Sequence, residues 1–511
     1  MVTVDPRVRA IALPAGVAVV LVAIIGPTLM PGLAFWDTAE FQAVPPILGT
    51  MHPTGYPTYV VLGFVVNLLL TPLGEPAFRM NVLSLISVAL AASLAAWLIR
   101  ELTGRSLIAA AVGIGLGLTP VVWAIATRAD AHALHLALVT TLIALLVRWE
   151  RAQSADDPRA DRWLVLAAVV YGLAAGNHSL TLLLAPPVGL YVLAVEPRIL
   201  RRPRLIATCL AVAVGVLALV YLELPLRAGP FRAALVYARP ETWDGFWYIA
   251  LAEQFRGSLG NPFADLPTKL NDLAGFASRQ LGPLALAVPL AFLATVARAP
   301  RFALLTGSAM LITVLFNAAY SNADLERYYL GPALFAWLWL GLLAATILDQ
   351  ASPPVSEPDQ PPPRILGVGL SAVLAIGLLV PTILAFPARA ELEDRSPDNS
   401  ARRWLDAVFQ ALPPDSVIVS WWSVSTPLWY GQYVEGRRLD VLVVDDRTML
   451  DRGYGEASDV VERFYRSRPV FMIRANAHDL GLVLLRFDLQ PLPGDTLHDV
   501  YRVVGPRTAS P

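Results

Sequence analysis

Long apolar runs without charge constrain this chain more than any other feature. Runs such as 10–30 and 365–386 are long enough to cross the bilayer hydrocarbon, which takes about 20 residues of helix. Only 15% of the residues are charged, whereas a soluble globular chain has about 25%. These features predict a polytopic α-helical membrane protein and exclude a soluble enzyme or a disordered protein. The formal net charge of −1 provides no basic field for nucleic acid.

Twelve apolar segments are visible in the sequence. They cover about 10–30, 56–73, 80–99, 107–127, 133–147, 163–176, 179–195, 205–222, 281–297, 302–322, 328–348 and 365–386. The first is interpreted as an uncleaved span, because no small-residue cleavage site follows it. Segment 56–73 is short, begins among prolines and contains Asn67. We predict that it lies at the membrane interface rather than crossing the bilayer.

The distribution of arginine over the short loops decides the predicted orientation. If 56–73 is interfacial, most arginines of the short loops lie on the inner side, and the short outer loops contain only Arg79, Arg128 and Arg327. If 56–73 spans the membrane instead, the excess of arginine moves to the outer side. The positive-inside rule favours the first arrangement. It predicts about eleven spans in the plasma (inner) membrane, a cytoplasmic N-terminus and an extracytoplasmic C-terminus.

Two domains are expected. A transmembrane module covers 1–386; it includes outer loops 31–79 and 223–280 and a proline-rich cytoplasmic linker, 349–364. Residues 387–511 have ordinary soluble composition. There, short β-type runs at 417–420, 440–444, 469–473 and 500–504 alternate with helix-like stretches at 401–411 and 458–468. This alternation predicts a small extracytoplasmic α/β domain.

Polar residues gather on the predicted outer face. They are Asp37, Glu40 and His52 in the first loop, Arg128, Asp130, His132 and His135 at a later turn, then Asn177 and His178, and finally Arg327 and Tyr328. Ionisable groups at helix ends that face a cavity are functional by default. The pattern predicts an outward-facing site at the depth of lipid headgroups.

Each of these groups also has a structural interpretation. Asp37 and Glu40 could form a capping box at a helix start. His132 and His135 could ligate a metal, although an interfacial hydrogen-bonding role is favoured. Arg128 could extend to lipid headgroups. The sequence contains no G-x-x-x-x-G-K-[ST], G-x-S-x-G or H-E-x-x-H motif, so nucleotide-driven transport and common hydrolase chemistries have no sequence basis.

The order of these motifs resembles a known family. The run Trp36-Asp37-Thr38-Ala39-Glu40-Phe41, followed by His52-Pro53-Thr54-Gly55-Tyr56-Pro57, resembles the protein O-mannosyltransferase-like membrane family of the GT-C glycosyltransferase superfamily. The family's second proline is Thr54 here. Asp130 replaces the family's Glu, His132 its Tyr and His135 its Asn. The stretches Gly176-Asn177-His178 and Arg327-Tyr328-Tyr329 are also similar to the family.

The resemblance implies a GT-C-like fold of about eleven transmembrane helices, an interfacial helix and the C-terminal α/β domain. It also implies inverting transfer of a sugar, mannose or another hexose, from a polyprenyl-phosphate donor to an acceptor hydroxyl. Asp37 is the expected general base, and Glu40 would orient it or raise its pKa. Arg128, Arg327, His52 and His178 are candidates for the donor phosphate, because a departing phosphate needs cations or hydrogen-bond donors.

Asp130, His132, Asn177 and Tyr328 complete the expected substrate-binding set. No cofactor is obligatory, since the phosphate leaves as a stable anion; a divalent metal is compatible with the site but is not predicted. The expected partners are the lipid-linked donor, a protein or glycan acceptor and the bilayer. Two alternatives stay open: a transporter or flippase for a lipid-linked solute, and a non-catalytic membrane protein that binds envelope glycan. Polar or broken helices near the midplane would favour the transporter.

Overall fold

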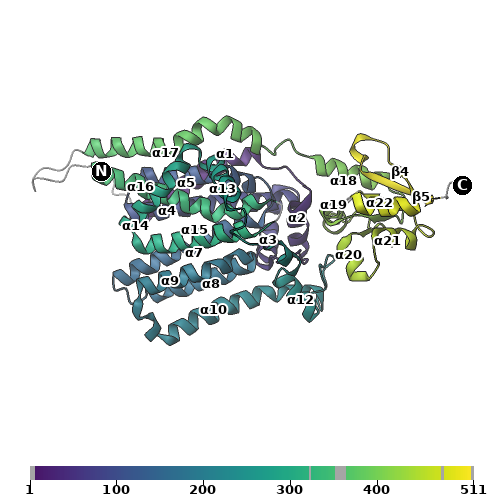
Figure 1. Cartoon of the computed structure of the whole chain (residues 1–511), viewed down its shortest axis with the longest axis horizontal. Coiled ribbons are helices and arrows are strands. Elements are labelled where there is room, and N and C mark those ends of the chain that lie inside the picture. The colour runs from purple at the N-terminus through teal and green to yellow at the C-terminus, as the bar shows by residue number, and fades with distance from the viewer. Residues whose placement is uncertain (1–5, 322–323, 352–363, 474–476, 508–511) are drawn as a thin grey trace, which may run out of the picture. The chain divides into compact units, whose positions relative to one another are not determined.

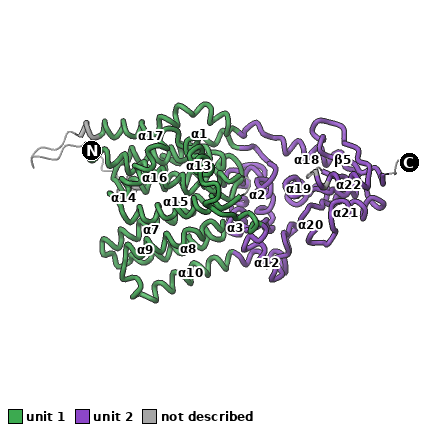
Figure 2. The backbone as a smooth tube through the Cα atoms, viewed as in Figure 1, with its two compact units in different colours: residues 1–29, 84–220, 255–394 green, residues 30–83, 221–254, 395–511 purple. Residues whose placement is uncertain are grey.

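A computed structural model describes residues 6–321, 324–351, 364–473 and 477–507 (Figure 1). Most of the predicted proline-rich linker, 349–364, lies outside these residues. The chain forms two compact units (Figure 2). Unit 1 comprises 1–29, 84–220 and 255–394; unit 2 comprises 30–83, 221–254 and 395–511. Residues 395–511 therefore cluster with most of both predicted outer loops, and the division at 386/387 stays a prediction.

Unit 1 is built from helices. Their bounds are α1 Pro6–Ile25, η1 Gly26–Thr28, α4 Pro76–Thr103 (which begins in unit 2), α5 Ser106–Gly117, α6 Pro120–Ala126, α7 Ala131–Ser154, α8 Asp161–Asn177, η3 Ser179–Leu184, α9 Ala185–Val195, η4 Pro197–Arg201, α10 Pro203–Tyr221, η5 Glu253–Ser258, α13 Leu266–Leu281, η6 Gly282–Ala287, α14 Val288–Arg298, α15 Pro300–Ala319, η7 Leu325–Tyr329, α16 Leu330–Ala351 and α17 Arg364–Glu393.

Within the described part of the chain, eight helices are long and apolar enough to cross a membrane, and a bent pair makes up to nine. The chain is thus a multi-pass membrane protein. The bent pair is α5 and α6, which meet at 66°. Pro120 begins α6 and has no N–H to donate, so the helix breaks before it.

The prediction of about eleven spans exceeds this number. Predicted spans 163–176 and 179–195 correspond to α8, with 17 residues, and to the short apolar stretch Ser179–Val195. Helix α3, Pro57–Leu69, falls within the segment predicted to be interfacial. Its 13 residues extend about 20 Å at 1.5 Å per residue, less than the hydrocarbon thickness of about 30 Å.

Small residues and buried polar bonds hold the helices of unit 1 together. Gly115 on α5 lies against the indole of Trp337 on α16, so closely that a methyl group there would overlap the ring. The same indole donates a hydrogen bond to Thr119 Oγ1 at 2.8 Å. Such close approaches and interhelical bonds replace the hydrophobic effect, which does not drive helices together in lipid.

Unit 2 combines helices with a mixed sheet. Its helices are α2 Trp36–Ile47, α3 Pro57–Leu69, η2 Thr71–Leu73, α11 Glu223–Ala228, α12 Trp243–Ala250, α18 Ser400–Ala411, α19 Trp422–Trp429, η8 Tyr430–Val434, α20 Asp446–Arg452, α21 Ala457–Phe464, α22 Ala477–Arg486 and η9 Asp495–Leu497. Its strands are β1 Val417–Val419, β2 Leu442–Val444, β3 Val470–Ile473, β4 Phe487–Pro491 and β5 Val500–Pro506.

The strand order is β2-β1-β3-β5-β4. Strand β1 is parallel to β2 and β3, with Val417 opposite Leu442 and Val470, whereas β5 is antiparallel to β3 and β4. The four predicted strands and both predicted helices of the α/β domain are confirmed. Strand β4 was not predicted; it is five residues long, begins directly after α22 and has one buried position.

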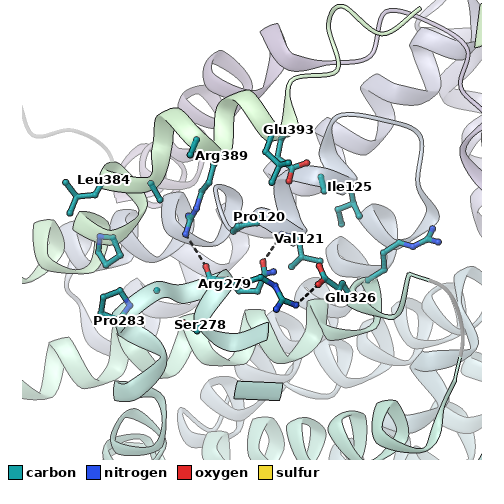
Figure 3. A pocket seen from close by; sticks show the side chains of 18 of the residues that line it. Pro120, Val121, Ile125, Ser278, Arg279, Pro283, Glu326, Leu384, Arg389 and Glu393 are labelled. Atoms are coloured by element: carbon teal, nitrogen blue, oxygen red, sulfur yellow. Dashed lines mark hydrogen bonds and ion pairs between the residues drawn. The ribbon is translucent and has the colours of Figure 1, made fainter. Parts of the chain in front are cut away.

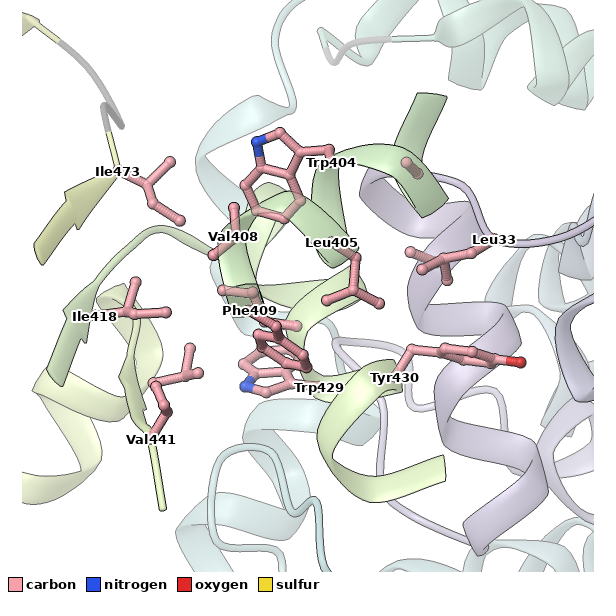
Figure 4. Close-up of a cluster of buried hydrophobic side chains, with 14 of the residues drawn as sticks. Leu33, Trp404, Leu405, Val408, Phe409, Ile418, Trp429, Tyr430, Val441 and Ile473 are labelled. Carbon is pink, nitrogen blue, oxygen red and sulfur yellow. The ribbon is translucent and has the colours of Figure 1, made fainter. Parts of the chain in front are cut away.

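The core of unit 2 extends from the sheet to the first outer loop (Figure 4). Leu33, just before α2, lies near Leu405 of α18 and Tyr430 of η8. The hydroxyl of Tyr430 accepts a hydrogen bond from the backbone N–H of Ala77 at 3.1 Å. Helix α2 is therefore positioned by the buried face of the α/β domain.

Candidate functional site

Helix α2 carries the two carboxylates that the sequence singles out. The residue before it, Phe35, is extended and is the N-cap, so Asp37 lies in the first turn and does not cap the helix. The proposed capping box is therefore absent. The side chain of Asp37 is half-buried, whereas Glu40, one turn later, is 1% exposed. A negative charge in the first turn is favourable because it faces the positive end of the helix dipole.

Glu40 is bound to His52. Its Oε1 accepts a hydrogen bond from the backbone N–H of His52 at 2.9 Å, and its Oε2 pairs with the imidazole Nδ1. His52 is itself buried. The structure thus brings Glu40 and His52 together, and these two contacts of Glu40 fix the segment that follows α2.

Aromatic rings surround this pair. The His52 ring lies 5.1 Å from the ring of Trp422 and 5.3 Å from that of Tyr56, between centroids. Trp36 is 56% exposed, and its ring meets Trp421 edge-on at 5.6 Å. Sequence reasoning missed Trp421 and Trp422. They follow the carboxyl end of a parallel strand, β1, which is where ligand sites of α/β sheets lie, and that position was the available signal.

In unit 1, Asp130 is the N-cap of α7. Its Oδ1 accepts hydrogen bonds from the backbone N–H of His132 at 2.8 Å and from His132 Nδ1 at 2.9 Å. Its Oδ2 lies 3.5 Å from Arg327 Nη1. Burial alone would raise the pKa of Asp130, but His132 and Arg327 outweigh it and hold that pKa below its usual value. Arg327 also pairs with Asp324 at 3.1 Å.

Three imidazoles and a phenol ring lie against one another beside Asp130. The His132 and His178 rings are 4.7 Å apart, those of His135 and His178 are 5.5 Å apart, and Tyr328 lies 5.5 Å from His132. Asn177 donates to the Ala131 carbonyl at 2.9 Å and so joins the ends of α8 and α7. Over the described ranges, no three His, Cys, Asp or Glu side chains are placed to hold a metal ion.

A cavity of about 890 Å³ opens in unit 1 (Figure 3). Its walls come from α6, the end of α13, η6, the residues around η7 and the last three turns of α17. Predicted site residues Arg128 and Arg327 line it. So do Arg279 and Arg389, which sequence reasoning did not single out. Asp37, Glu40 and His52 belong to unit 2, and the other predicted site residues belong to unit 1.

Comparison with known structures identifies the architecture. ArnT from Cupriavidus metallidurans bound to undecaprenyl phosphate aligns with a TM-score of 0.61 at 16% identity, over 97% of this chain and 98% of that chain. The archaeal oligosaccharyltransferase AglB from Archaeoglobus fulgidus, in complex with an inhibitory peptide and a dolichol-phosphate, aligns with a TM-score of 0.55 at 13% identity, over 92% and 70%. The chain has a GT-C-like fold.

The sequence comparisons agree with the resemblance. A family model described as the protein O-mannosyl-transferase TMEM260 N-terminal domain matches residues 37–200. Protein O-mannosyl-transferase TMEM260 of Mus musculus is 25% identical over 458 residues. That match covers 84% of this chain and 61% of the mouse protein, so the chain spans about three fifths of that relative's length. The predicted resemblance to the protein O-mannosyltransferase-like family is confirmed. The matched region includes Asp37 but not Arg327.

Proposed function

We propose that the chain is a membrane glycosyltransferase, which transfers mannose or another hexose from a polyprenyl phosphate to an acceptor hydroxyl on the outer membrane face. The match to the O-mannosyl-transferase family model supports this proposal. So does the GT-C-like fold, which is shared with proteins whose structures hold undecaprenyl phosphate and dolichol-phosphate. The proposed partners are therefore a lipid-linked sugar and a protein or glycan acceptor.

The different environments of Asp37 and Glu40 carry the assignment of the general base. Glu40 is buried and both of its oxygens contact His52. Asp37 retains contact with solvent in the first turn of the same helix. A base must reach the proton of an incoming acceptor, so Asp37 suits this role and Glu40 suits a positioning role.

The chemistry is a single displacement with inversion. The acceptor oxygen attacks the anomeric carbon while Asp37 takes the hydroxyl proton. The bond from that carbon to the phosphate oxygen breaks, and polyprenyl phosphate leaves with the electron pair. One carboxylate is sufficient, because phosphate is a stable leaving group and needs no acid to protonate it. The negative charge on the departing phosphate requires a cation, for which Arg128 is our first candidate.

Arg327 and the imidazoles have other contacts. Arg327 pairs with Asp130 and Asp324, and His52 pairs with Glu40. His178 accepts a hydrogen bond from the Leu180 backbone N–H at its Nδ1 at 3.1 Å. We therefore propose that Arg327, His52 and His178 position the segments around them, as do Asp130, His132, Asn177 and Tyr328.

The test is the variant Asp37→Asn in purified, nanodisc-embedded protein. It is supplied with labelled polyprenyl-phosphate mannose and a mixture of serine- and threonine-containing peptides. Loss of a general base should lower the transfer rate at least about 100-fold while binding of the lipid donor is unchanged. A matched control is Asp244→Asn, which removes a carboxylate from the first turn of another helix of unit 2, α12.

Transfer by Asp37→Asn at the wild-type rate would remove Asp37 as the base. Wild-type protein that moves the labelled lipid across a membrane without releasing polyprenyl phosphate would contradict the proposal and support a flippase. Binding of envelope glycan without either activity would support the non-catalytic alternative. Glycan analysis of the cell envelope after gene deletion would identify the acceptor.

We also propose the predicted location: the plasma (inner) membrane, with a cytoplasmic N-terminus and an extracytoplasmic C-terminal domain. The excess of arginine in the predicted inner loops supports this orientation. In a Cys209→Ser background, a membrane-impermeant maleimide should label Asp398→Cys in intact cells but not Ala155→Cys. The opposite pattern would contradict the orientation.

A further inference from the structure

More arginines than carboxylates line the cavity of unit 1. Four arginines line it, Arg128, Arg279, Arg327 and Arg389, against three carboxylates, Asp324, Glu326 and Glu393. Most of the remaining lining residues are apolar. An apolar cavity is a costly place for a cation, because a charge loses its hydration there. Which arginines are neutralised therefore decides what the cavity can bind.

Two of the four arginines have carboxylate partners. Arg279 Nη2 donates to Glu326 Oε1 at 2.8 Å, a pair visible in Figure 3. Arg327 lies 3.5 Å from Asp130 Oδ2 and 3.1 Å from Asp324 Oδ2. The charges of Arg279 and Arg327 are thus compensated by the protein itself.

Arg389 is different. It lies on α17 and is 8% exposed. Its guanidinium donates to the carbonyl of Leu118 at 3.0 Å, to Thr382 Oγ1 at 3.4 Å and to the carbonyl of Gln280 at 3.4 Å. All three acceptors are neutral oxygens. They satisfy hydrogen bonds of the guanidinium and supply only the partial negative charge of carbonyls near helix ends, because Arg389 has no carboxylate partner in the described residues.

Arg128 is the second uncompensated cation. Its Nε is buried and has no hydrogen-bond partner in the structure as described. It follows the short helix α6, whose first residue, Pro120, also lines the cavity. Arg128 as a whole is half-buried, and a cavity-lining arginine that no carboxylate neutralises is suited to an anionic ligand, because the guanidinium fork fits phosphate oxygens.

The apolar walls indicate what the anion is attached to. Pro120, Pro283 and Pro381 lie around the cavity, and its rim includes Leu384, which is 77% exposed. Figure 3 shows Leu384 on the same helix as Arg389. In a chain that spans a membrane, an exposed leucine on a spanning helix faces lipid. A ligand with a hydrocarbon chain can thus enter from the bilayer and place its charged end inside.

We infer that this cavity binds the phosphate and the first isoprene units of the lipid-linked donor, and that Arg389 acts with Arg128 as a phosphate-binding residue. The prenyl nature of the ligand rests on the proposed function. The presence of Arg128 and Arg389 in the lining and the apolar walls do not rest on it. A phospholipid headgroup shares the same chemistry, so the experiment must separate the two sources.

The experiment measures binding of geranylgeranyl monophosphate and of geranylgeraniol to the full chain in nanodiscs of neutral lipid. Wild-type protein should prefer the phosphate over the alcohol. Arg389→Gln should reduce this preference at least about tenfold while the affinity for the alcohol is kept, because only charged hydrogen bonds are lost. Arg128→Gln should act in the same direction, and Arg389→Lys should retain part of the preference. Arg279→Gln is the matched control, because that arginine is neutralised by Glu326.

An equal loss of affinity for both ligands in Arg389→Gln would indicate a purely structural role and overturn the assignment of Arg389. The Nε of Arg128 has no hydrogen-bond partner among the described residues, so Arg128→Gln reports on the cavity even if Arg389→Gln does not fold. An unchanged preference in Arg128→Gln would overturn the site. Displacement of the prenyl phosphate by equimolar phosphatidylglycerol would assign the cavity to phospholipid. Wild-type protein that binds the prenyl phosphate but transfers no sugar would leave this site intact and contradict the proposed function.

Discussion

Glu40 and His52 form a buried pair in which one carboxylate contacts both the backbone and the side chain of one residue. Oε1 accepts from the His52 N–H at 2.9 Å, while Oε2 pairs with Nδ1. Glu40 is 1% exposed and His52 is 7% exposed. The pair connects α2 to the segment that leads into α3. The position of Asp37 on α2 therefore depends on the contact between Glu40 and His52.

Glu40→Gln should destabilise the protein and lower transfer. Glutamine keeps one oxygen for the backbone N–H of His52 but loses the charge opposite the imidazole. The loss of a charge-assisted hydrogen bond costs about 1.5–3 kcal/mol of unfolding free energy. Thermal unfolding of the nanodisc-embedded protein measures the change. A cycle with His52→Gln should be strongly non-additive, because the two residues touch.

The control for this prediction is Glu241→Gln. Glu241 lies 3.8 Å from Arg232, whose side chain is 58% exposed, and exposed pairs contribute about 0–1 kcal/mol. Additive effects of Glu40→Gln and His52→Gln would contradict the coupling that the structure shows.

Asp130→Asn should cost far more than a comparable change at an exposed ion pair. Asparagine can still cap α7 through its side-chain oxygen. Arg327, whose side chain is 17% exposed, then keeps only its contact with Asp324. Removing one partner of a buried pair costs about 3–5 kcal/mol when the other charge is left unpaired, so the remaining contact with Asp324 makes this range an upper bound.

The comparison is Asp161→Asn, which removes the partner of Arg202 at a site where both side chains are more than one-third exposed. The expected loss there is about 0–1 kcal/mol. Both variants are compared by thermal unfolding at neutral pH. Equal losses would show that the Asp130–Arg327 contact is not a buried ion pair.

Local sequence patterns predicted the elements and the carboxylates on α2. Apolar length identified most of the spans, and short β-type runs identified four strands of the α/β domain. The partner of Glu40 could not be identified, because it lies 12 residues away, beyond a turn. The contact between Asp130 and Arg327 joins residues separated by 197 positions. The periodicity of a sequence does not indicate which distant residues contact each other, because tertiary packing decides those contacts.

Arg389 shows why a candidate binding residue was missed. In sequence it follows an apolar run and looks like a charge at the end of a span. Its acceptors, Leu118, Gln280 and Thr382, come from a break between two helices, from the end of α13 and from α17 itself. The cavity forms where segments that are far apart in the sequence meet, and no local pattern predicts that meeting.

Gly115→Ala should impair folding of unit 1. A methyl group at this position would overlap the indole of Trp337, which is 1% exposed and cannot move aside without losing its bond to Thr119. Overpacking of this kind costs about 1–3 kcal/mol. The yield of monodisperse protein and its melting temperature measure the effect. Gly189→Ala is the control, because a Cβ there has nothing within 4 Å. Equal behaviour of the two variants would contradict the close packing of α5 against α16.

The stability of unit 2 should fall as pH rises through the range set by Asp445. Burial raises the pKa of Asp445 to about 6, from 3.8 in the unfolded chain. Its Oδ1 accepts from the Thr448 N–H at 2.8 Å, whereas Oδ2 is buried with no partner among the described residues. The folded state therefore binds this proton more tightly than the unfolded state does. The resulting stability is fully present below about pH 4 and is lost as pH rises through about 6.

Asp445→Asn should flatten this dependence. Asparagine keeps the oxygen that caps α20 and carries no charge at any pH. The variant should therefore become more stable relative to wild type as pH rises. The difference in unfolding free energy between pH 4 and pH 7 should reach at most about 3 kcal/mol, at 1.36 kcal/mol per pKa unit. Hydrogen exchange of the amides in α20, corrected for the intrinsic pH dependence, measures it in the full chain. The control is Asp495→Asn, which removes a carboxylate at an exposed position in η9. A wild-type protein that gains stability over Asp445→Asn between pH 4 and pH 7 would show that this carboxylate is stabilised as an anion, contrary to its unpaired Oδ2.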